Sequence, residues 1–136
     1  MANALFDSGR QKFLEGSIPI LTDNIKLILV DHGVDTPLPA TDDFLDDILA
    51  GARVATSGNF ASKTSTAGVF DAADMVLTAV TGATVESIVI YDDTPATEAT
   101  KPLIAFIDTA TGLPLTPNGA DVTVQWDSGA NRIFKL

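Results

Sequence analysis

The stretch that decides the fold is Val85–Leu136, which reads VESIVIYDDTPATEATKPLIAFIDTATGLPLTPNGADVTVQWDSGANRIFKL. Segments rich in Gly, Pro, Asn and Asp divide it into short runs with the composition of β-strands. These runs are Val85–Tyr91, Pro102–Asp108, Asp121–Trp126 and Arg132–Leu136. Short β runs joined by such turns are typical of antiparallel sandwiches and barrels. We therefore expect a mainly β protein, an antiparallel β-sandwich of jelly-roll type.

The sequence before Val85 adds further strands. Ile25–Val30 (IKLILV) is nearly continuous apolar sequence, which is typical of a central buried strand. Arg53–Thr56 is predicted as a short strand, and Gly58–Gly68 as a hairpin or a loop. Met75–Val80 and Val85–Tyr91 flank the turn TGAT and suit another hairpin. We count seven or eight strands and find no internal repeat or dividing linker, so residues 1–136 are expected to form one domain.

One segment carries a clear helical pattern. In Thr41–Ala50 (TDDFLDDILA), Thr41 suits the N-cap and Gly51 the end of the helix. At 100° per residue the apolar side chains form one arc and the acids form the opposite one. The apolar arc is Phe44, Leu45, Ile48 and Leu49, and the acidic arc is Asp42, Asp43, Asp46 and Asp47.

The first 16 residues are predicted to form a short helix or an arm, 1–16. Within Ala4–Glu15 the apolar side chains repeat at helical spacing, which places Leu5, Phe6, Phe13 and Leu14 on one face. The alternative architecture for the whole chain is a parallel, doubly wound sheet. It requires helices between the strands, and the sequence has no such helices after Gly51.

Composition narrows the classes of function. Apolar residues make up 46% of the chain, which argues against disorder, and there is no cysteine for a disulfide, a thiolate zinc site or a nucleophile. With 18 acids against 8 bases the formal charge is −10, which disfavours nucleic acid and anionic membranes as partners.

The apolar runs are far shorter than the roughly 20 residues that span a bilayer. MANALFDSGRQKF lacks the pattern of a secretion signal, so we expect the chain to fold in a cytoplasm.

The chain has one candidate for a catalytic base. The single histidine, His32, follows Asp31 in a turn-like DHGVD, where a carboxylate could orient it as a base. No nucleophile can be singled out for it, so we favour a loop histidine that titrates freely. One histidine also excludes a multi-histidine zinc site, and no glycine-rich phosphate loop is present.

The acidic residues and the tryptophan have plain structural interpretations. A helix presents too few of its carboxylates to one point to bind calcium, so the acidic arc of Thr41–Ala50 is interpreted as a solvated face. Asp92, Asp93 and Glu98 are interpreted as an exposed acidic loop, because glycoside cleavage also needs aromatic platforms. Trp126 shares a strand face with Val122 and Val124 and is interpreted as a core anchor rather than a ligand platform. We therefore expect no catalytic residue, no cofactor and no metal, and hence no enzyme.

Five segments of the chain have a shared likeness: ALFDSGRQKFLEG, IKLILVD, LDDILAGARVATSG, VESIVIYDD and, most distinctively, PLIAFIDTATGLPLTPNGADVTVQWDSGANRIFKL. Together they resemble small structural proteins of tailed bacteriophages. The proteins that they resemble are the cement or decoration proteins that sit on the capsid shell.

The resemblance implies a virion protein without catalytic activity that binds the outer capsid surface and stabilises it. Its partner would be the major capsid protein, and it would be made in the host cytoplasm. Such modules are generally symmetric, so we expect a homo-oligomer, a dimer or a trimer. Candidate oligomer or capsid contacts are Leu5, Phe6 and Phe13. Two alternatives remain, a phage tail or fibre-attachment protein and a ligand-binding β-sandwich module.

Overall fold

A computed structural model describes residues 3–136. Its largest element is a five-stranded sheet, made of β1 (Ala4–Leu5), β8 (Leu103–Ile107), β7 (Ser87–Asp92), β2 (Ile25–Val30) and β3 (Arg53–Thr56), in that order. Every neighbouring pair in it is antiparallel. The central strands β2 and β7 are apolar runs and are buried on both faces of the sheet, as expected for strands without alternation.

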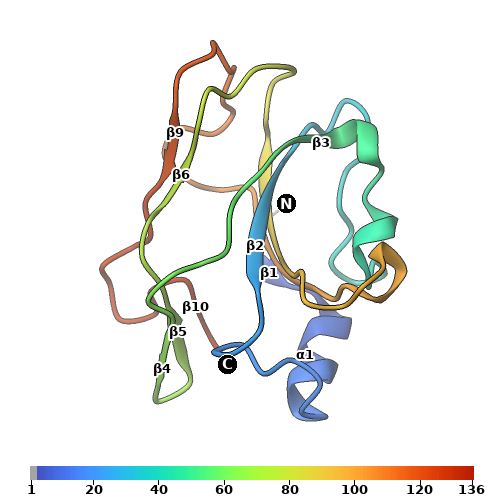
Figure 1. The fold of residues 1–136 in the computed structure, drawn as a ribbon, viewed down its shortest axis with the longest axis vertical. Coiled ribbons are helices and arrows are strands. Elements are labelled where there is room, and N and C mark those ends of the chain that lie inside the picture. Colours follow the sequence, from blue (N-terminus) through green and yellow to red (C-terminus); the bar gives the residue numbers. More distant parts are fainter. Residues whose placement is uncertain (1–2) are drawn as a thin grey trace.

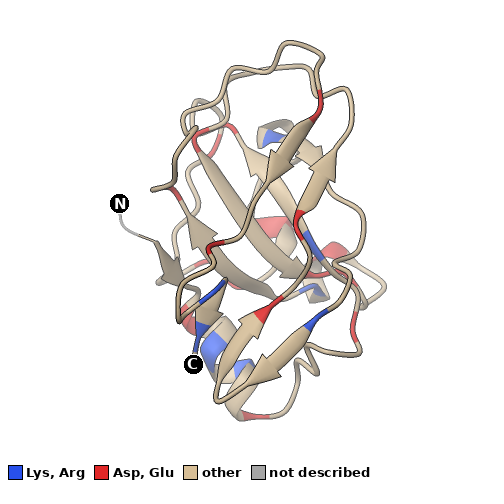
Figure 2. Ribbon diagram, turned by 90° about the vertical axis from the view of Figure 1, so that its left-hand side faces the viewer, with Lys and Arg blue, Asp and Glu red and all other residues tan. Residues whose placement is uncertain are grey.

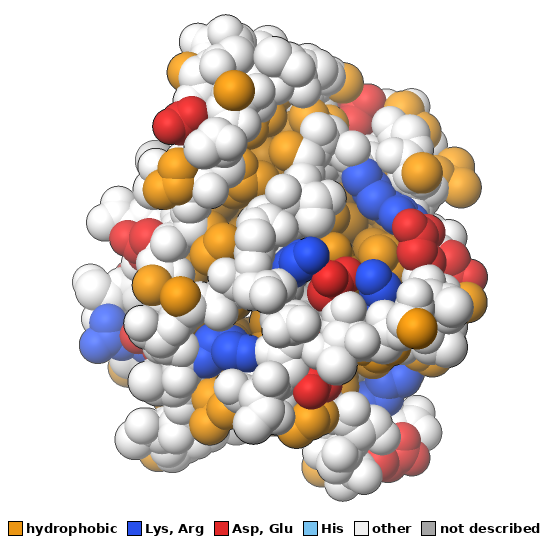
Figure 3. Space-filling view, in the orientation of Figure 1, with side chains coloured by type: hydrophobic (Ala, Val, Ile, Leu, Met, Phe, Trp, Pro, Cys, Tyr) orange, Lys and Arg blue, Asp and Glu red, His pale blue; other side chains and the backbone are white. Residues whose placement is uncertain are grey.

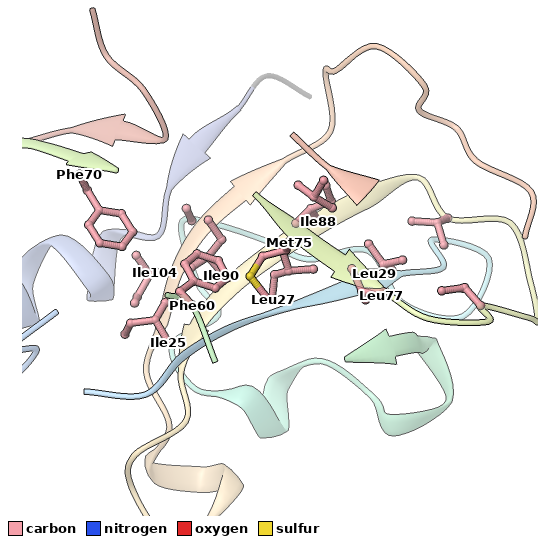
Figure 4. Close-up of a cluster of buried hydrophobic side chains, with 14 of the residues drawn as sticks. Ile25, Leu27, Leu29, Phe60, Phe70, Met75, Leu77, Ile88, Ile90 and Ile104 are labelled. Atoms are coloured by element: carbon pink, nitrogen blue, oxygen red, sulfur yellow. The ribbon is translucent and has the colours of Figure 1, made fainter. Parts of the chain in front are cut away.

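Two smaller antiparallel sheets lie on one side of β2 (Figure 1). One contains β10 (Phe134–Lys135), β5 (Val69–Asp71) and β4 (Thr64–Thr66), and the other pairs β6 (Met75–Leu77) with β9 (Val122–Val124). The largest hydrophobic core lies between them and the five-stranded sheet (Figure 4). It joins Leu27 and Ile90 of the large sheet to Phe70 and Leu77 of the small ones.

The other face of the five-stranded sheet is covered by coil and short 3₁₀ turns. These are η1 (Leu45–Asp47), η2 (Ala50–Ala52) and η3 (Glu98–Thr100). Beneath them lies a second core, in which Ile48 and Phe106 are fully buried. We call this the coil face, and the opposite one the small-sheet face.

Most of the strand predictions are confirmed. The strands at Ile25–Val30 and Arg53–Thr56 have the predicted bounds, and all four runs of Val85–Leu136 contain strands. The hairpin alternative for Gly58–Gly68 is confirmed in its second half, where β4 turns into β5 through Ala67 and Gly68, both at positive φ. The hairpin around TGAT is wrong, because β6 pairs with β9 and β7 pairs with β2 and β8.

The predicted helix at Thr41–Ala50 is wrong, because only the 3₁₀ turn η1 and the first residue of η2 form there. The carboxylate of Asp47 accepts hydrogen bonds from the backbone N–H groups of Asp43 and Phe44, which fixes an extended backbone at Phe44. The guanidinium of Arg53 donates to the carbonyl oxygens of Leu45 and Ile48. Acidic side chains that bond locally to backbone compete with helix in this way.

The N-terminal segment is both an arm and a helix. After β1, the helix α1 (Asp7–Leu14) packs on β8 so closely that a Cβ on Gly9 would lie 2.6 Å from the Leu103 carbonyl oxygen. Glycine is therefore required at this contact. The single apolar helix face predicted for this segment is wrong, since Leu5 lies in β1, Phe6 is buried and the Leu14 side chain is 89% exposed.

The fold is thus mainly β, with antiparallel sheets that do not close into a barrel and one α-helix among the described residues. The parallel, doubly wound alternative is wrong, since every strand pair in residues 3–136 is antiparallel.

Candidate binding groove

A groove of about 590 Å³ opens between the β1 edge of the large sheet and the segment that runs from the end of β9 to β10. Its floor is apolar and comes from both layers, with Ile88, Ala105 and Ile107 from the large sheet and Val124 from β9. Both ends of the chain contribute to it, Asn3 and Leu5 from one end and Phe134 and Lys135 from the other.

Trp126 forms one wall of this groove. Its indole N–H donates to the Ala73 carbonyl oxygen at 3.1 Å, and its backbone N–H donates to the Asp74 carboxylate at 3.0 Å. Its ring packs against Phe60, with the ring centroids 5.5 Å apart. The interpretation as a core anchor is confirmed in that Trp126 packs on the main core beside Val122. It is only half-buried, however, and it also lines the groove.

A smaller apolar depression of about 380 Å³ adjoins the groove at the chain ends. It is lined by Phe13 and Leu14 of α1 and by Leu136, and it shares Leu5 and Lys135 with the larger groove. Phe13 is positioned by Phe134, whose ring centroid lies 6.0 Å away. The side chains of Leu14 and Leu136 are 89% and 59% exposed. We call the two depressions together the terminal groove.

The rim of the terminal groove is cationic. Arg10, Arg132 and Lys135 line it, against one acid, Asp127. Figure 2 shows basic residues on α1 and near the C-terminal end, and others elsewhere on the molecule. Arg10 lies 3.2 Å from the carboxylate of Asp7 and Arg132 lies 3.9 Å from that of Asp71, both in exposed ion pairs. Such pairs are worth about 0–1 kcal/mol, so an incoming carboxylate can compete for either arginine.

The backbone along the groove is held in an extended form. The Asn3 side chain accepts hydrogen bonds from the N–H groups of Asp108 and Thr109 and donates to the Thr109 carbonyl oxygen. Phe6 N–H donates to the Ile104 carbonyl oxygen at 2.9 Å. Since antiparallel bonds alternate along a strand, the N–H and carbonyl of Leu5 point away from β8, towards the open edge.

A second, smaller groove separates the free edges of β3 and β6. It measures about 270 Å³ and is lined by 54–58 and 76–81, without a charged side chain. Figure 3 shows hydrophobic side chains in the hollow beside the part of the molecule that carries β6. The small-sheet face is therefore open at two sides, and only the terminal groove combines its apolar floor with charge.

His32 lies in the turn after β2, as the interpretation as a loop histidine expects, but its ring has partners. Its Nε2 atom lies 2.8 Å from the hydroxyl oxygen of Ser87, and its ring stacks on Phe106 with centroids 6.1 Å apart. No sequence pattern indicates this pair, because the two residues are 55 positions apart and Ser87 begins a strand. The Ser87 side chain is fully buried, so a substrate cannot reach the hydroxyl without opening the sheet. The pair is positioned to fix the turn after β2.

The interpretation of Asp92, Asp93 and Glu98 as an exposed loop is wrong for two of the three. Asp92 ends β7 and is buried; burial, and after it a hydrogen bond with Asp23, raises its pKa from 3.8 to about 6. Asp93 lies 2.8 Å from the ammonium of Lys26 and 2.6 Å from that of Lys101. Burial alone would raise the pKa of Asp93, but the hydrogen bonds from the two lysines outweigh it and lower that pKa.

Two acids of the predicted helix, Asp42 and Asp47, bond to backbone, and Asp46 and Asp47 are exposed as the interpretation as a solvated face expects. Asp42 accepts a hydrogen bond from Leu38 N–H at 2.8 Å, and its pKa is raised mainly by burial. The pKa of Asp47 is lowered, mainly by the hydrogen bond from Asp43 N–H. Within residues 3–136 no group of three or more acidic or histidine side chains is arranged to bind a metal ion.

The three candidate contact residues separate in the structure. Leu5 and Phe13 line the terminal groove, whereas Phe6 is fully buried in the core of the coil face. The N-terminal segment packs on its own sheet, with β1 paired to β8 and α1 lying against β8. Arg10, Trp126 and Lys135 are groove residues that the sequence pattern did not point to.

Comparison with protein-family models and with curated proteins gives no match. Among the described residues, no helix has the length and apolar character needed to cross a membrane.

Proposed function

We propose that this chain is a structural protein of a tailed bacteriophage, without catalytic activity, that binds the outer surface of the capsid and stabilises it. The resemblance of its N-terminal, strand and C-terminal segments to cement proteins is the starting point. The terminal groove is the observation that carries the proposal. It is an open, apolar surface with a cationic rim, whereas His32, Asp92 and Asp93 are bound to other residues of the same chain.

In this role the partner is the major capsid protein, and neither nucleic acid nor membrane is bound. A bridging protein acts through buried area and through strands added at sheet edges. The open edges at β1, β3 and β6 support this mode of binding. A jelly-roll-like sandwich is the finer architecture that we propose for the sheets, and the virion surface is the location.

The oligomer in this proposal is a dimer or a trimer, because capsid sites of this kind lie on or near symmetry axes. Leu14 is the residue with which to test it, since its side chain is 89% exposed and lies in the terminal groove. Deleting residues 1–16 would also remove Phe6 from the core. We expect Leu14→Glu to lower the oligomer mass measured by light scattering if this groove holds the subunits together, and to leave it unchanged if capsid protein fills the groove.

Two other functions are supported by particular features. A tail or fibre-attachment protein would use the same open strand edges. A ligand-binding β module is favoured by the apolar floor of the 590 Å³ groove, whose size is within the range of small-molecule sites.

The test is the position of the protein in purified phage particles, by mass spectrometry and cryo-electron microscopy. Copy numbers comparable to the capsid protein on the outer shell support decoration, and a few copies per particle support a tail role. Absence from particles contradicts both and leaves the ligand-binding module. Heads that lack the protein should rupture at a lower temperature than complete heads. Equal robustness would mean that the protein decorates the shell without stabilising it.

A further inference from the structure

We propose that the terminal groove binds an extended peptide segment of a partner protein that carries carboxylate side chains and lies alongside β1. The proposal rests on the proposed function only for the identity of the partner as capsid protein. The chemistry of the segment follows from the charges, backbone and floor of the groove.

The charges of the rim select a carboxylate. Three of the chain's eight basic residues, Arg10, Arg132 and Lys135, line this groove with one acid among them, although the whole chain has a charge of −10. Lys135 makes no ion pair with another residue of the described chain. Interactions between exposed charges fade beyond about 8 Å at physiological salt, so a segment in the groove experiences mainly these nearby cations.

The open edge of β1 selects an extended backbone. The N–H and carbonyl of Leu5 face away from β8, and no other described residue hydrogen-bonds to them. An added strand would satisfy both groups, which is how edge strands recognise peptides. Because side chains of a strand alternate between its faces, every second residue of the segment would lie on the apolar floor and the others on the rim.

The floor matches that alternation. Among the lining residues, Ile88 is buried and Ile107 and Trp126 are half-buried, whereas Arg132 and Lys135 are exposed. In a segment that alternates apolar and acidic residues, the apolar side chains would contact the apolar floor and the acidic side chains would contact the cationic rim. Nucleic acid also carries negative charge, but an acidic chain repels a long polyanion outside the groove.

The experiment uses the full chain and two synthetic probes, acetylated and amidated peptides of sequence EVEVEV and KVKVKV. Trp126 is the only tryptophan and lies in the groove, so its fluorescence reports binding directly. We expect saturable binding of EVEVEV that weakens about tenfold or more between about 50 mM and 500 mM salt, and at least tenfold weaker binding of KVKVKV.

The variant is Arg132→Glu with Lys135→Glu, and the matched control is Lys12→Glu with Lys63→Glu. Both change the net charge equally, but Lys12 lies over the Phe44 ring and Lys63 bonds to the Asp23 carbonyl, both outside the groove. The groove variant should lose EVEVEV binding, and the control should keep it within about threefold. Arg132→Gln with Lys135→Gln should show an intermediate loss of EVEVEV binding. It replaces the Glu variant in the test if that variant does not fold.

Three results would overturn the proposal. They are the absence of EVEVEV binding up to about 5 mM, equal binding of both peptides, and equal losses in the groove and control variants. The outcome is independent of the virion test. Protein present on particles with an inert groove would refute this inference alone, while peptide binding by a protein absent from particles would refute the capsid role alone.

Discussion

The two faces of the five-stranded sheet are covered in different ways. On the coil face, side-chain hydrogen bonds to backbone hold irregular segments against the sheet, chiefly through Arg53, Asp42 and Asp47. On the small-sheet face, apolar packing joins the layers and the edges stay open as grooves. On the coil face, which we call closed, polar side chains bond to the same chain. On the small-sheet face, which we call open, cations and strand edges remain available to another molecule.

The largest expected difference between the faces is in core truncation. Phe106 is fully buried beneath the coil face, whereas Phe60 packs beside Trp126 on the open face. We expect Phe106→Ala to cost about 3–5 kcal/mol of unfolding free energy. Phe60→Ala should cost less, because the neighbouring small sheet can move into the space. Urea unfolding measures both, and equal losses would mean that the two cores are equally rigid.

Arg53 tests the polar attachment of the coil face. Its guanidinium donates to the carbonyl oxygens of Leu45 and Ile48 and lies 2.8 Å from the Glu98 carboxylate. Arg53→Met should lower the unfolding free energy by about 2–4 kcal/mol, because it leaves the Ile48 carbonyl without a donor and the Leu45 carbonyl with only the N–H of Ile48. The control is Arg132→Met, whose exposed pair is expected to contribute less than about 1 kcal/mol. Similar effects of the two variants would contradict a special role for Arg53.

Asp92 makes stability depend on pH. Its folded-state pKa of about 6 exceeds the ordinary value of 3.8, so the folded state binds the proton more tightly than the unfolded state does. Its contribution therefore falls as the pH rises from about 4 to about 6, by an amount on the order of 1–3 kcal/mol. Asp92→Asn should remove this slope, as measured by urea unfolding at several pH values. A slope unchanged in the variant would assign it to another group.

Asp93 makes stability depend on pH in the opposite direction. Its pKa is lowered by Lys101 and Lys26, so its contribution is present above pH 3.8 and is lost as the pH falls through its folded-state value. Asp93→Asn should therefore destabilise the protein at pH 7 and reduce the loss in acid. If it instead stabilised the protein at pH 7, the lysine pairs would not be favourable.

The smallest expected effect on the unfolding free energy comes from changes on the small-sheet face. Arg132→Glu with Lys135→Glu should change the unfolding free energy by no more than about 0.5 kcal/mol, because both side chains are exposed and outside the cores. Thermal unfolding checks this. A large loss would mean that the cations serve the fold, and the contrast between the two faces would then be wrong.

Local pattern sufficed for some elements and failed for others. Ile25–Val30 was predictable, because an apolar run of that length fits a sheet interior whatever its partners, and Arg53–Thr56 was predicted as a short strand with the bounds it has. The helix at Thr41–Ala50 was not, since the side-chain bonds of Asp47 and Arg53 to nearby backbone, which replace it, leave no mark in the helical periodicity. Nor was the terminal groove, because its walls come from opposite ends of the chain.

The pairing of β1 with β8 has a consequence for synthesis. Ala4 is opposite Phe106, and β5 completes its sheet only with β10, where Val69 is opposite Lys135. During synthesis β1 is therefore made long before its partner β8, and β5 long before its partner β10. Contacts so distant in sequence favour slow folding. Until residues 132–135 have been synthesised, the terminal groove lacks one of its walls and cannot bind a partner.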